Sequence, residues 1–273
     1  MGARVTQIDT ALSDTLAWLH EEPGPGLSQW LRADSSGVFW IQGKAGSGKS
    51  TAMKFLLESP QTLKLLNGPN EDKLWLLVGS FFTGCNERIQ ASWLGILHDM
   101  VYQILKRRPA LMGKAVAAFL ARRHSAWNMD SLEQLLLSFF NDPDYTIHVC
   151  FLIDALDEHD GKHDRMCTFL HELAGTGSEQ PRVKVIAASR PRNDLRDLLA
   201  SDETFVMQDW TRGDIQTYIA GRLSQQLRWQ KLERTDNHGT ATKIKQDILE
   251  RAQGVFLWVR LVINEMVFEI QNG

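Results

Sequence analysis

Residues 43–50 read Gly-Lys-Ala-Gly-Ser-Gly-Lys-Ser and form a complete G-x-x-x-x-G-K-[ST] phosphate-binding loop. The apolar run Val38–Ile41 directly precedes this loop, and the helix-forming residues 51–57 follow it. The order of strand, loop and helix matters because backbone N–H groups and a helix N-terminus must converge on the same phosphate. The sequence therefore predicts a chain that binds a nucleoside triphosphate, or that descends from one that did.

The residues of the loop have separate expected roles. Its glycines can adopt backbone conformations closed to other residues, so that successive N–H groups point at phosphate oxygens. We predict that the Lys49 ammonium reaches the β and γ phosphates and that the Ser50 hydroxyl binds Mg²⁺. The predicted nucleotide contacts are Gly43, Lys44, Ala45, Gly46, Ser47, Gly48, Lys49, Ser50 and Thr51.

A second stretch, Cys150–Glu158, supplies the acidic groups that such a loop needs. Its apolar first half predicts a buried strand that ends in Asp154, at the sheet edge where nucleotides bind in open α/β folds. We predict that Asp154 holds Mg²⁺, directly or through water, and that Glu158 polarises the attacking water. Asp157 is the next candidate for that catalytic role. The alternative for the Asp157-Glu158 pair is a solvated helix start, which acidic residues favour.

The next expected strand, Val183–Ala188, ends in Ser189-Arg190-Pro191. A polar residue at this point faces the γ-phosphate if the strand lies beside the one that ends in Asp154, so we predict Arg190 as a sensor of that phosphate. A surface ion pair is the alternative role for Arg190. The chain has no Asn-Lys-x-Asp segment of the kind that binds guanine. The expected ligands are therefore ATP or ADP, with Mg²⁺.

Composition narrows the class of protein. The chain has 273 residues and a formal net charge of −3, so no overall attraction to nucleic acid is expected. The most hydrophobic late stretch, Val255–Ile270, contains charged residues, and we expect no membrane span. The three cysteines, Cys85, Cys150 and Cys167, form no C-x-x-C pair and indicate thiols in a reducing compartment. A cytoplasmic location is the expectation.

The order of elements predicts an α/β class, namely a P-loop NTPase with a parallel sheet flanked by helices and followed by a small all-helical lid domain. We expect a helical N-terminal segment over residues 1–36, a core over 37–210 and the lid over 211–273. The N-terminal helix is expected at Ile8–His20. Further strands are expected at Lys73–Phe82, Thr146–Ile153 and Phe205–Gln208, and core helices at Ser92–Leu105, Ser131–Phe140 and Asp164–Ala174.

After Asp209 the pattern is helical only. Thr211 is the expected N-cap, with Asp214 in the first turn. Three lid helices are expected at Asp214–Trp229, Thr240–Ala252 and Val255–Ile270, with a polar break at Thr235–Gly239. The apolar stripe of the last helix is interpreted as packing on its neighbours, with a partner-binding surface as the alternative.

Two other features have a structural and a functional interpretation. Three tryptophans near the loop, Trp18, Trp30 and Trp40, are interpreted as core residues, with base stacking as the alternative. His159 and His163 are four residues apart, but their spacing lacks the glutamate of a zinc-binding H-E-x-x-H motif. We therefore do not predict a zinc site.

With these motifs placed, the chain resembles the NACHT domains of fungal NLR-like proteins, which belong to the STAND class of P-loop ATPases, and it is similar to the nephrocystin-like N-terminal NTPase domain. The resemblance covers nearly the whole chain. It rests on Trp30-Leu31, Phe39–Thr51, Ser80–Phe82, Phe151–Glu158, Ala188–Pro191 and Gly254–Val259. Ala45 stands where relatives commonly have proline, and the last helix lacks the proline that plant-type relatives present to adenine.

The resemblance implies a regulatory switch that is closed with ADP, self-associates with ATP and resets by slow hydrolysis. It assigns the phosphate and Mg²⁺ roles to Lys49 and Ser50, the metal role to Asp154, the hydrolytic role to Glu158 and the sensor role to Arg190. It also implies effector and repeat domains in a full-length protein. A stand-alone ATPase that remodels a partner, with faster and partner-stimulated turnover, is one alternative. A degenerate interaction module without nucleotide affinity is another.

Overall fold

The central feature of the fold is a parallel β-sheet. The computed structural model describes residues 5–68, 74–82, 92–122, 125–141, 145–159, 161–176, 183–235 and 239–272. Within them the sheet has the strand order β2-β3-β4-β1-β5, and every adjacent pair is parallel. The strands are β1 (Gly37–Gln42), β2 (Trp75–Phe81), β3 (His148–Asp154), β4 (Val183–Ser189) and β5 (Glu203–Val206).

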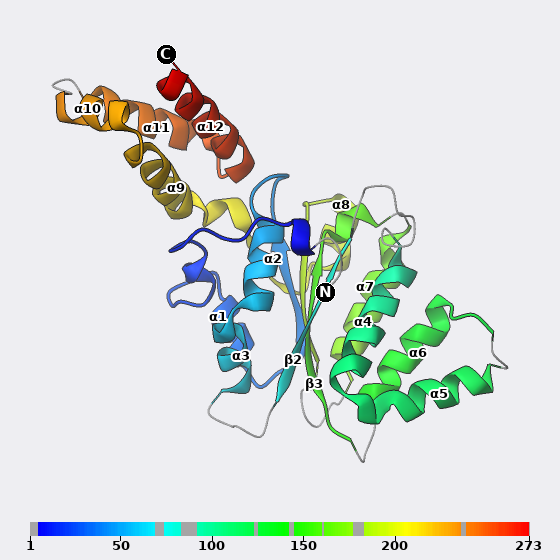
Figure 1. Cartoon of the computed structure of the whole chain (residues 1–273). Coiled ribbons are helices and arrows are strands. Elements are labelled where there is room, and N and C mark those ends of the chain that lie inside the picture. The colour runs from blue at the N-terminus through cyan, green and yellow to red at the C-terminus, as the bar shows by residue number, and fades with distance from the viewer. Residues whose placement is uncertain are drawn as a thin grey trace.

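Helices cover both faces of this sheet (Figure 1). One face carries α1 (Leu27–Arg32), α2 (Lys49–Glu58) and α3 (Pro60–Asn67). The other carries α4 (Trp93–Arg107), α6 (Met129–Phe140) and α7 (His163–Ala174), and α5 (Met112–Ala121) packs against α6. The short helix α8 (Asn193–Leu198) follows β4 and packs on α7.

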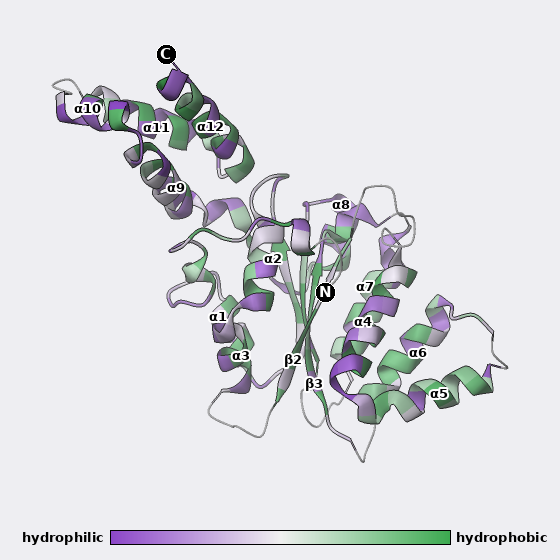
Figure 2. Cartoon of the chain, viewed as in Figure 1, coloured by the Kyte–Doolittle hydropathy of each residue, from purple (hydrophilic) through white to green (hydrophobic). Residues whose placement is uncertain are grey.

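Alternation along β3 explains why the strand is apolar throughout. Val149, Phe151 and Ile153 belong to the core under α4, α6 and α7, whereas Cys150 and Leu152 belong to the core under α1–α3. All five are 0% exposed, and the sheet is hydrophobic between its two helical layers (Figure 2). A sheet buried on both faces needs apolar residues at consecutive positions. The predicted α/β class with a helix-flanked parallel sheet is confirmed.

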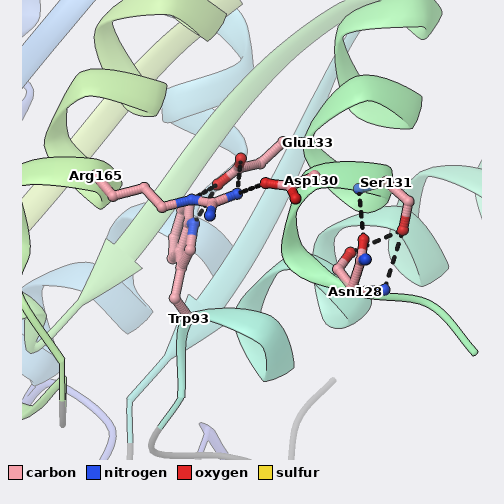
Figure 3. Close-up of polar contacts among 6 residues, drawn as sticks. All are labelled: Trp93, Asn128, Asp130, Ser131, Glu133 and Arg165. Atoms are coloured by element: carbon pink, nitrogen blue, oxygen red, sulfur yellow. Dashed lines mark hydrogen bonds and ion pairs between the residues drawn. The ribbon is translucent and has the colours of Figure 1, made fainter.

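Polar contacts fix the helices on the second face (Figure 3). Asn128 and Ser131 form a capping box at the start of α6, in which each side chain accepts the other residue's backbone N–H. Arg165 of α7 forms ion pairs with Asp130 and Glu133 of α6. The two carboxylates of α6 therefore link this helix to α7 through the Arg165 ion pairs.

The C-terminal part of the chain forms a separate helical unit with its own core (Figure 1). Its helices are α9 (Arg212–Ser224), α10 (Leu227–Thr235), α11 (Thr240–Ala252) and α12 (Phe256–Asn272). The single helix expected over 214–229 is wrong, because the chain breaks between α9 and α10. Leu223 and Trp229 are both buried, and a six-residue spacing places them far apart around one straight helix.

Thr211 stands at the expected N-cap position of α9, with Asp214 in the first turn, but the expected side-chain cap is absent. The Thr211 hydroxyl donates to the carbonyls of Gln208 and Gly254, and it caps no N–H of α9. Asp214 instead accepts the backbone N–H of Leu16 and the indole N–H of Trp18, from a segment nearly 200 residues away. Contacts in the folded chain thus replaced the local capping that the sequence predicts.

The helix expected at Ile8–His20 is absent. Within that range the structure has only a short 3-10 turn at Ala17–Leu19, and another turn, Val5–Gln7, precedes the range. Asp14 and Leu16 have φ angles of 64° and 63°, which a right-handed helix excludes. The physical reason is burial: this path places Leu16 and Leu19 in the core under α2, where they are 5% and 0% exposed.

Candidate nucleotide-binding site

The phosphate-binding loop joins β1 to α2, as the sequence predicts. Gly46 and Gly48 have φ angles of 72° and 100°, in the region that favours glycine. At Gly43 the constraint is space, because a Cβ there would lie 2.7 Å from Ser47 Oγ and 2.9 Å from Met207 Cβ. The glycines are thus required by this loop conformation.

The Lys49 ammonium lies over the loop that precedes it. It donates to the backbone carbonyls of Gly43 at 2.7 Å and Lys44 at 3.0 Å. Burial lowers the pKa of Lys49, while the negative charges of Asp154, Asp157 and Glu158 act in the opposite direction. The three carboxylates predicted from the sequence are therefore close enough to act on this ammonium.

Asp154 is the last residue of β3, and it is 1% exposed. Ala155 follows with a φ of 60°, and this left-handed residue turns the chain into a short 3-10 turn, Leu156–Glu158. The turn is closed by the N–H of Glu158, which donates to the Ala155 carbonyl at 2.9 Å. The conformation thus keeps both acidic residues of the turn at the carboxyl edge of the sheet.

Arg190 follows β4, which lies between β3 and β1. Its backbone N–H donates to Asp157 Oδ1 at 2.9 Å, and its Nε lies 3.3 Å from Asp157 Oδ2. The Asp157 side chain is 7% exposed and that of Arg190 is 55% exposed. The ion pair considered as an alternative for Arg190 is present, and its partner is one of the predicted site residues.

The sequence interpretation missed that the helical lid contacts the loop. The backbone N–H of Leu257, at the start of α12, donates to the Gly46 carbonyl at 3.0 Å. The Gln208 side chain accepts the N–H of Lys44 at 3.1 Å. Gly254 has a φ of 74°, and a Cβ there would lie 2.5 Å from the Gln208 carbonyl. The available signal was Gly254, which lies two residues before the start of α12.

A cavity of about 560 Å³ lies among the loop, the lid and the N-terminal segment. The loop and α2 contribute Ser50 and Thr51, and the lid contributes Phe256. The N-terminal segment contributes Leu12 and Thr15, which the sequence interpretation did not identify. No local motif marks residues 9–16, so only their position in the fold reveals this wall.

The residues present fit a phosphate and a cation. Ser47 Oγ is buried inside the loop and has no hydrogen-bond partner among the described residues. Such a buried hydroxyl suits a phosphate oxygen. The Ser50 hydroxyl and the Asp154 carboxylate are the oxygen donors that Mg²⁺ prefers, and both lie at the ends of elements that meet at this edge of the sheet.

The tryptophans and histidines considered in the sequence analysis have structural contacts. Trp30 and Trp40 are 4% and 2% exposed and pack in the two cores, and Trp18 stacks on Trp210 at 5.8 Å. His163 contacts Asp194 through Nδ1 and the Leu156 carbonyl through Nε2. Cys85, Lys73 and residues 236–238 of the expected polar break lie outside the described residues.

Among the residues described, no helix has the length and apolar character needed to cross a bilayer.

Three comparisons place the chain among known proteins. Residues 14–190 match the family model described as nephrocystin 3, N-terminal. The chain is 21% identical over 259 residues to the vegetative incompatibility protein HET-E-1 of Podospora anserina, in a match that covers 92% of this chain and 18% of that protein. The chain therefore spans less than a fifth of the length of this curated relative.

A structure of Drosophila ORC bound to DNA is similar at a TM-score of 0.46 and 16% identity, over 88% of this chain and 58% of the other. The family match carries more weight because it extends over about two thirds of the chain and includes the loop, Asp154 and Arg190. This chain belongs to the nephrocystin 3 N-terminal family.

Proposed function

We propose that this chain is an ATP-binding regulatory switch in which the bound nucleotide sets the position of the helical lid. The observation that carries this proposal is the hydrogen bond from Leu257 of the lid to the Gly46 carbonyl of the phosphate-binding loop. A lid that bonds to the loop itself responds to what the loop holds. The ATP-bound and ADP-bound forms then differ in lid position because ATP has a γ-phosphate that contacts the site and ADP does not.

In this proposal residues 43–51 hold the phosphates of ATP or ADP. Lys49 is already placed over the loop, and exchanging its bonds to the Gly43 and Lys44 carbonyls for phosphate oxygens pairs a buried cation with anions. Ser50 and Asp154 hold Mg²⁺, which neutralises phosphate charge.

Hydrolysis is proposed to be slow and to reset the switch. Glu158 accepts the proton of the attacking water, and Arg190 contacts the γ-phosphate. Slow hydrolysis fits a site whose groups serve mainly to distinguish ATP from ADP. A machine that remodels a partner needs faster turnover, and no observation in the described residues favours it.

The adenine and ribose are proposed to occupy the cavity beyond the loop. The cavity is lined by Leu12, Tyr218 and Phe256, which suit the faces of a purine, and by the polar side chains of Thr15 and Asn264. Its volume of about 560 Å³ lies in the range of small-molecule sites. The N-terminal segment, which Asp214 of α9 holds beside the lid, then forms a further wall around the nucleotide.

We also propose that the switch acts within a longer protein that carries effector and repeat domains. The support is the relation to HET-E-1, of which this chain matches 18%. ATP-dependent self-association is the proposed output, because lid movement exposes surfaces of α12 that now lie against the loop.

Isothermal titration tests the core of this proposal. Wild-type protein is expected to bind ATP and ADP in the presence of Mg²⁺, and Lys49→Ala is expected to bind ATP more weakly by roughly 1.5–3 kcal/mol, the contribution of a charged hydrogen bond. Equal affinities for the wild type and Lys49→Ala, or no binding by either, would contradict the nucleotide-binding function. Light scattering tests self-association, and identical assembly with ADP and ATP would contradict the switch.

A further inference from the structure

The ion pair between Asp157 and Arg190 has a geometry that restricts what each residue does. Both carboxylate oxygens of Asp157 are engaged, Oδ1 by the backbone N–H of Arg190 and Oδ2 by its Nε. The carboxylate is almost buried, with 7% of its side chain exposed. A carboxylate that accepts a hydrogen bond through one oxygen and forms an ion pair through the other, both with one arginine, is poorly placed to accept a proton from water.

The guanidinium of Arg190 is held along one edge only. Asp157 contacts Nε, and no described residue pairs with the two terminal nitrogens. The guanidinium is a rigid planar fork, so fixing Nε also fixes the direction of the outer edge. That outer edge carries the pair of N–H groups suited to two oxygens of one phosphate.

The loop that carries Asp157 is itself fixed. His163 contacts the Leu156 carbonyl at 3.0 Å and Asp194 at 2.9 Å, and Arg192 contacts Asp194 from the loop that follows β4. The loops after β3 and β4 are therefore joined at two points, through Asp157 and through His163. The Asp157 carboxylate is a rigid support for the guanidinium it holds.

We propose that Asp157 is a positioning residue for Arg190, and that it orients the outer edge of the guanidinium toward the γ-phosphate of ATP. The proposal rests on the nucleotide-binding function proposed above. It separates the two acidic residues of the turn: Glu158 acts on the water, and Asp157 acts through Arg190. Since ADP lacks the γ-phosphate, Asp157 contributes to the preference for a triphosphate and makes no contribution to ADP affinity.

The test measures the ratio of the ADP dissociation constant to that of a non-hydrolysable ATP analogue, with Mg²⁺, by titration calorimetry. Asp157→Asn keeps the size of the side chain and an acceptor for the Arg190 N–H, but it removes the charge that holds Nε. We expect the ratio to fall by about 3- to 10-fold in Asp157→Asn and by about 10-fold or more in Arg190→Ala, with ADP affinity unchanged in both. The double variant should match Arg190→Ala alone, because Asp157 acts only through Arg190.

Asp130→Asn is the matched control. It removes the charge of one carboxylate from another arginine ion pair, that between Asp130 of α6 and Arg165 of α7 (Figure 3). Its ratio should equal that of the wild type. This control separates loss of an ion pair in general from loss of the support for Arg190.

Each other outcome overturns the assignment. An unchanged ratio with slower single-turnover ATP hydrolysis would make Asp157 a base. A higher ratio would mean that Asp157 restrains Arg190 away from the phosphate, and weaker ADP binding would mean that it supports the whole site. Additive losses in the double variant would make the two residues independent. In each of these cases the proposed function still stands if the wild type binds nucleotide and Lys49→Ala binds it more weakly. If the wild type binds no nucleotide, the proposed nucleotide-binding function itself is contradicted.

Discussion

The contact between Asp214 of α9 and the N-terminal segment yields a quantitative prediction about how the lid is held. Asp214 Oδ2 accepts the N–H of Leu16 at 3.2 Å and the indole N–H of Trp18 at 2.9 Å. Asp214→Ala leaves both donors without an acceptor. Each unsatisfied buried donor costs about 1–3 kcal/mol, so we expect a loss of roughly 2–4 kcal/mol in the free energy of unfolding, with the indole at the lower end because it is partly exposed.

Two variants separate the contributions. Asp214→Asn keeps an acceptor oxygen and removes a charge whose burial raises the pKa of Asp214, so its loss should stay below about 1 kcal/mol. Trp18→Phe removes one donor but keeps a ring beside Trp210, and its loss should be about 1 kcal/mol. Urea unfolding followed by circular dichroism measures all three. Equal stability of Asp214→Ala and the wild type, or an equal loss in Asp214→Asn and Asp214→Ala, would refute the reasoning.

Three further predictions concern the site and its surroundings. Glu158→Gln should still bind ATP while phosphate release falls by ~10²-fold or more; release at the wild-type rate would place the water-activating group elsewhere. Gly46→Ala should increase hydrogen exchange at the start of α12, because a Cβ there lies 2.8 Å from Leu257 Cβ. Gly26→Ala is its control, with a φ of 88° and open space around the Cβ. Burial lowers the pKa of His20 to about 4; the unfolded state therefore binds the proton first, and stability present above pH 6.5 should fall by about 1–2 kcal/mol as the pH drops toward 4. His20→Gln should remove that step in urea titrations, and an unchanged step would assign it to other groups.

The sheet was predictable because its signal is local. Each strand that is buried on both faces reads as a continuous apolar run, and the glycine-rich loop and the acidic strand end mark its carboxyl edge. Three helices of the core, α3, α5 and α8, were not predicted. In α5 the residues are apolar on nearly every side, so no 3.6-residue periodicity distinguishes the helix from a loop.

The walls of the cavity could not be predicted for a different reason. The bonds that place Leu16 and Trp18 run to Asp214, 198 and 196 residues away. The pattern at Thr211 and Asp214 is a normal local signal for a helix start, and nothing in it shows that the carboxylate is used elsewhere. The Asp157–Arg190 pair was predictable in part. Its members follow adjacent strands, so the sequence predicts that they are close but not that they bond.

The use of one loop by both the lid and the phosphates has a thermodynamic consequence. The Gly46 carbonyl that accepts the Leu257 N–H belongs to the same peptide group as the N–H of Ser47, inside the phosphate-binding loop. If phosphate binding changes the geometry of this peptide, it changes the strength of the lid bond. By linkage the lid bond then changes nucleotide affinity by the same factor. A variant at the base of the lid and outside the cavity, such as Gly254→Ala, whose Cβ would lie 2.5 Å from the Gln208 carbonyl, should therefore alter the affinity for ATP and ADP. Equal affinities in the wild type and in this variant would mean that the lid and the nucleotide are independent.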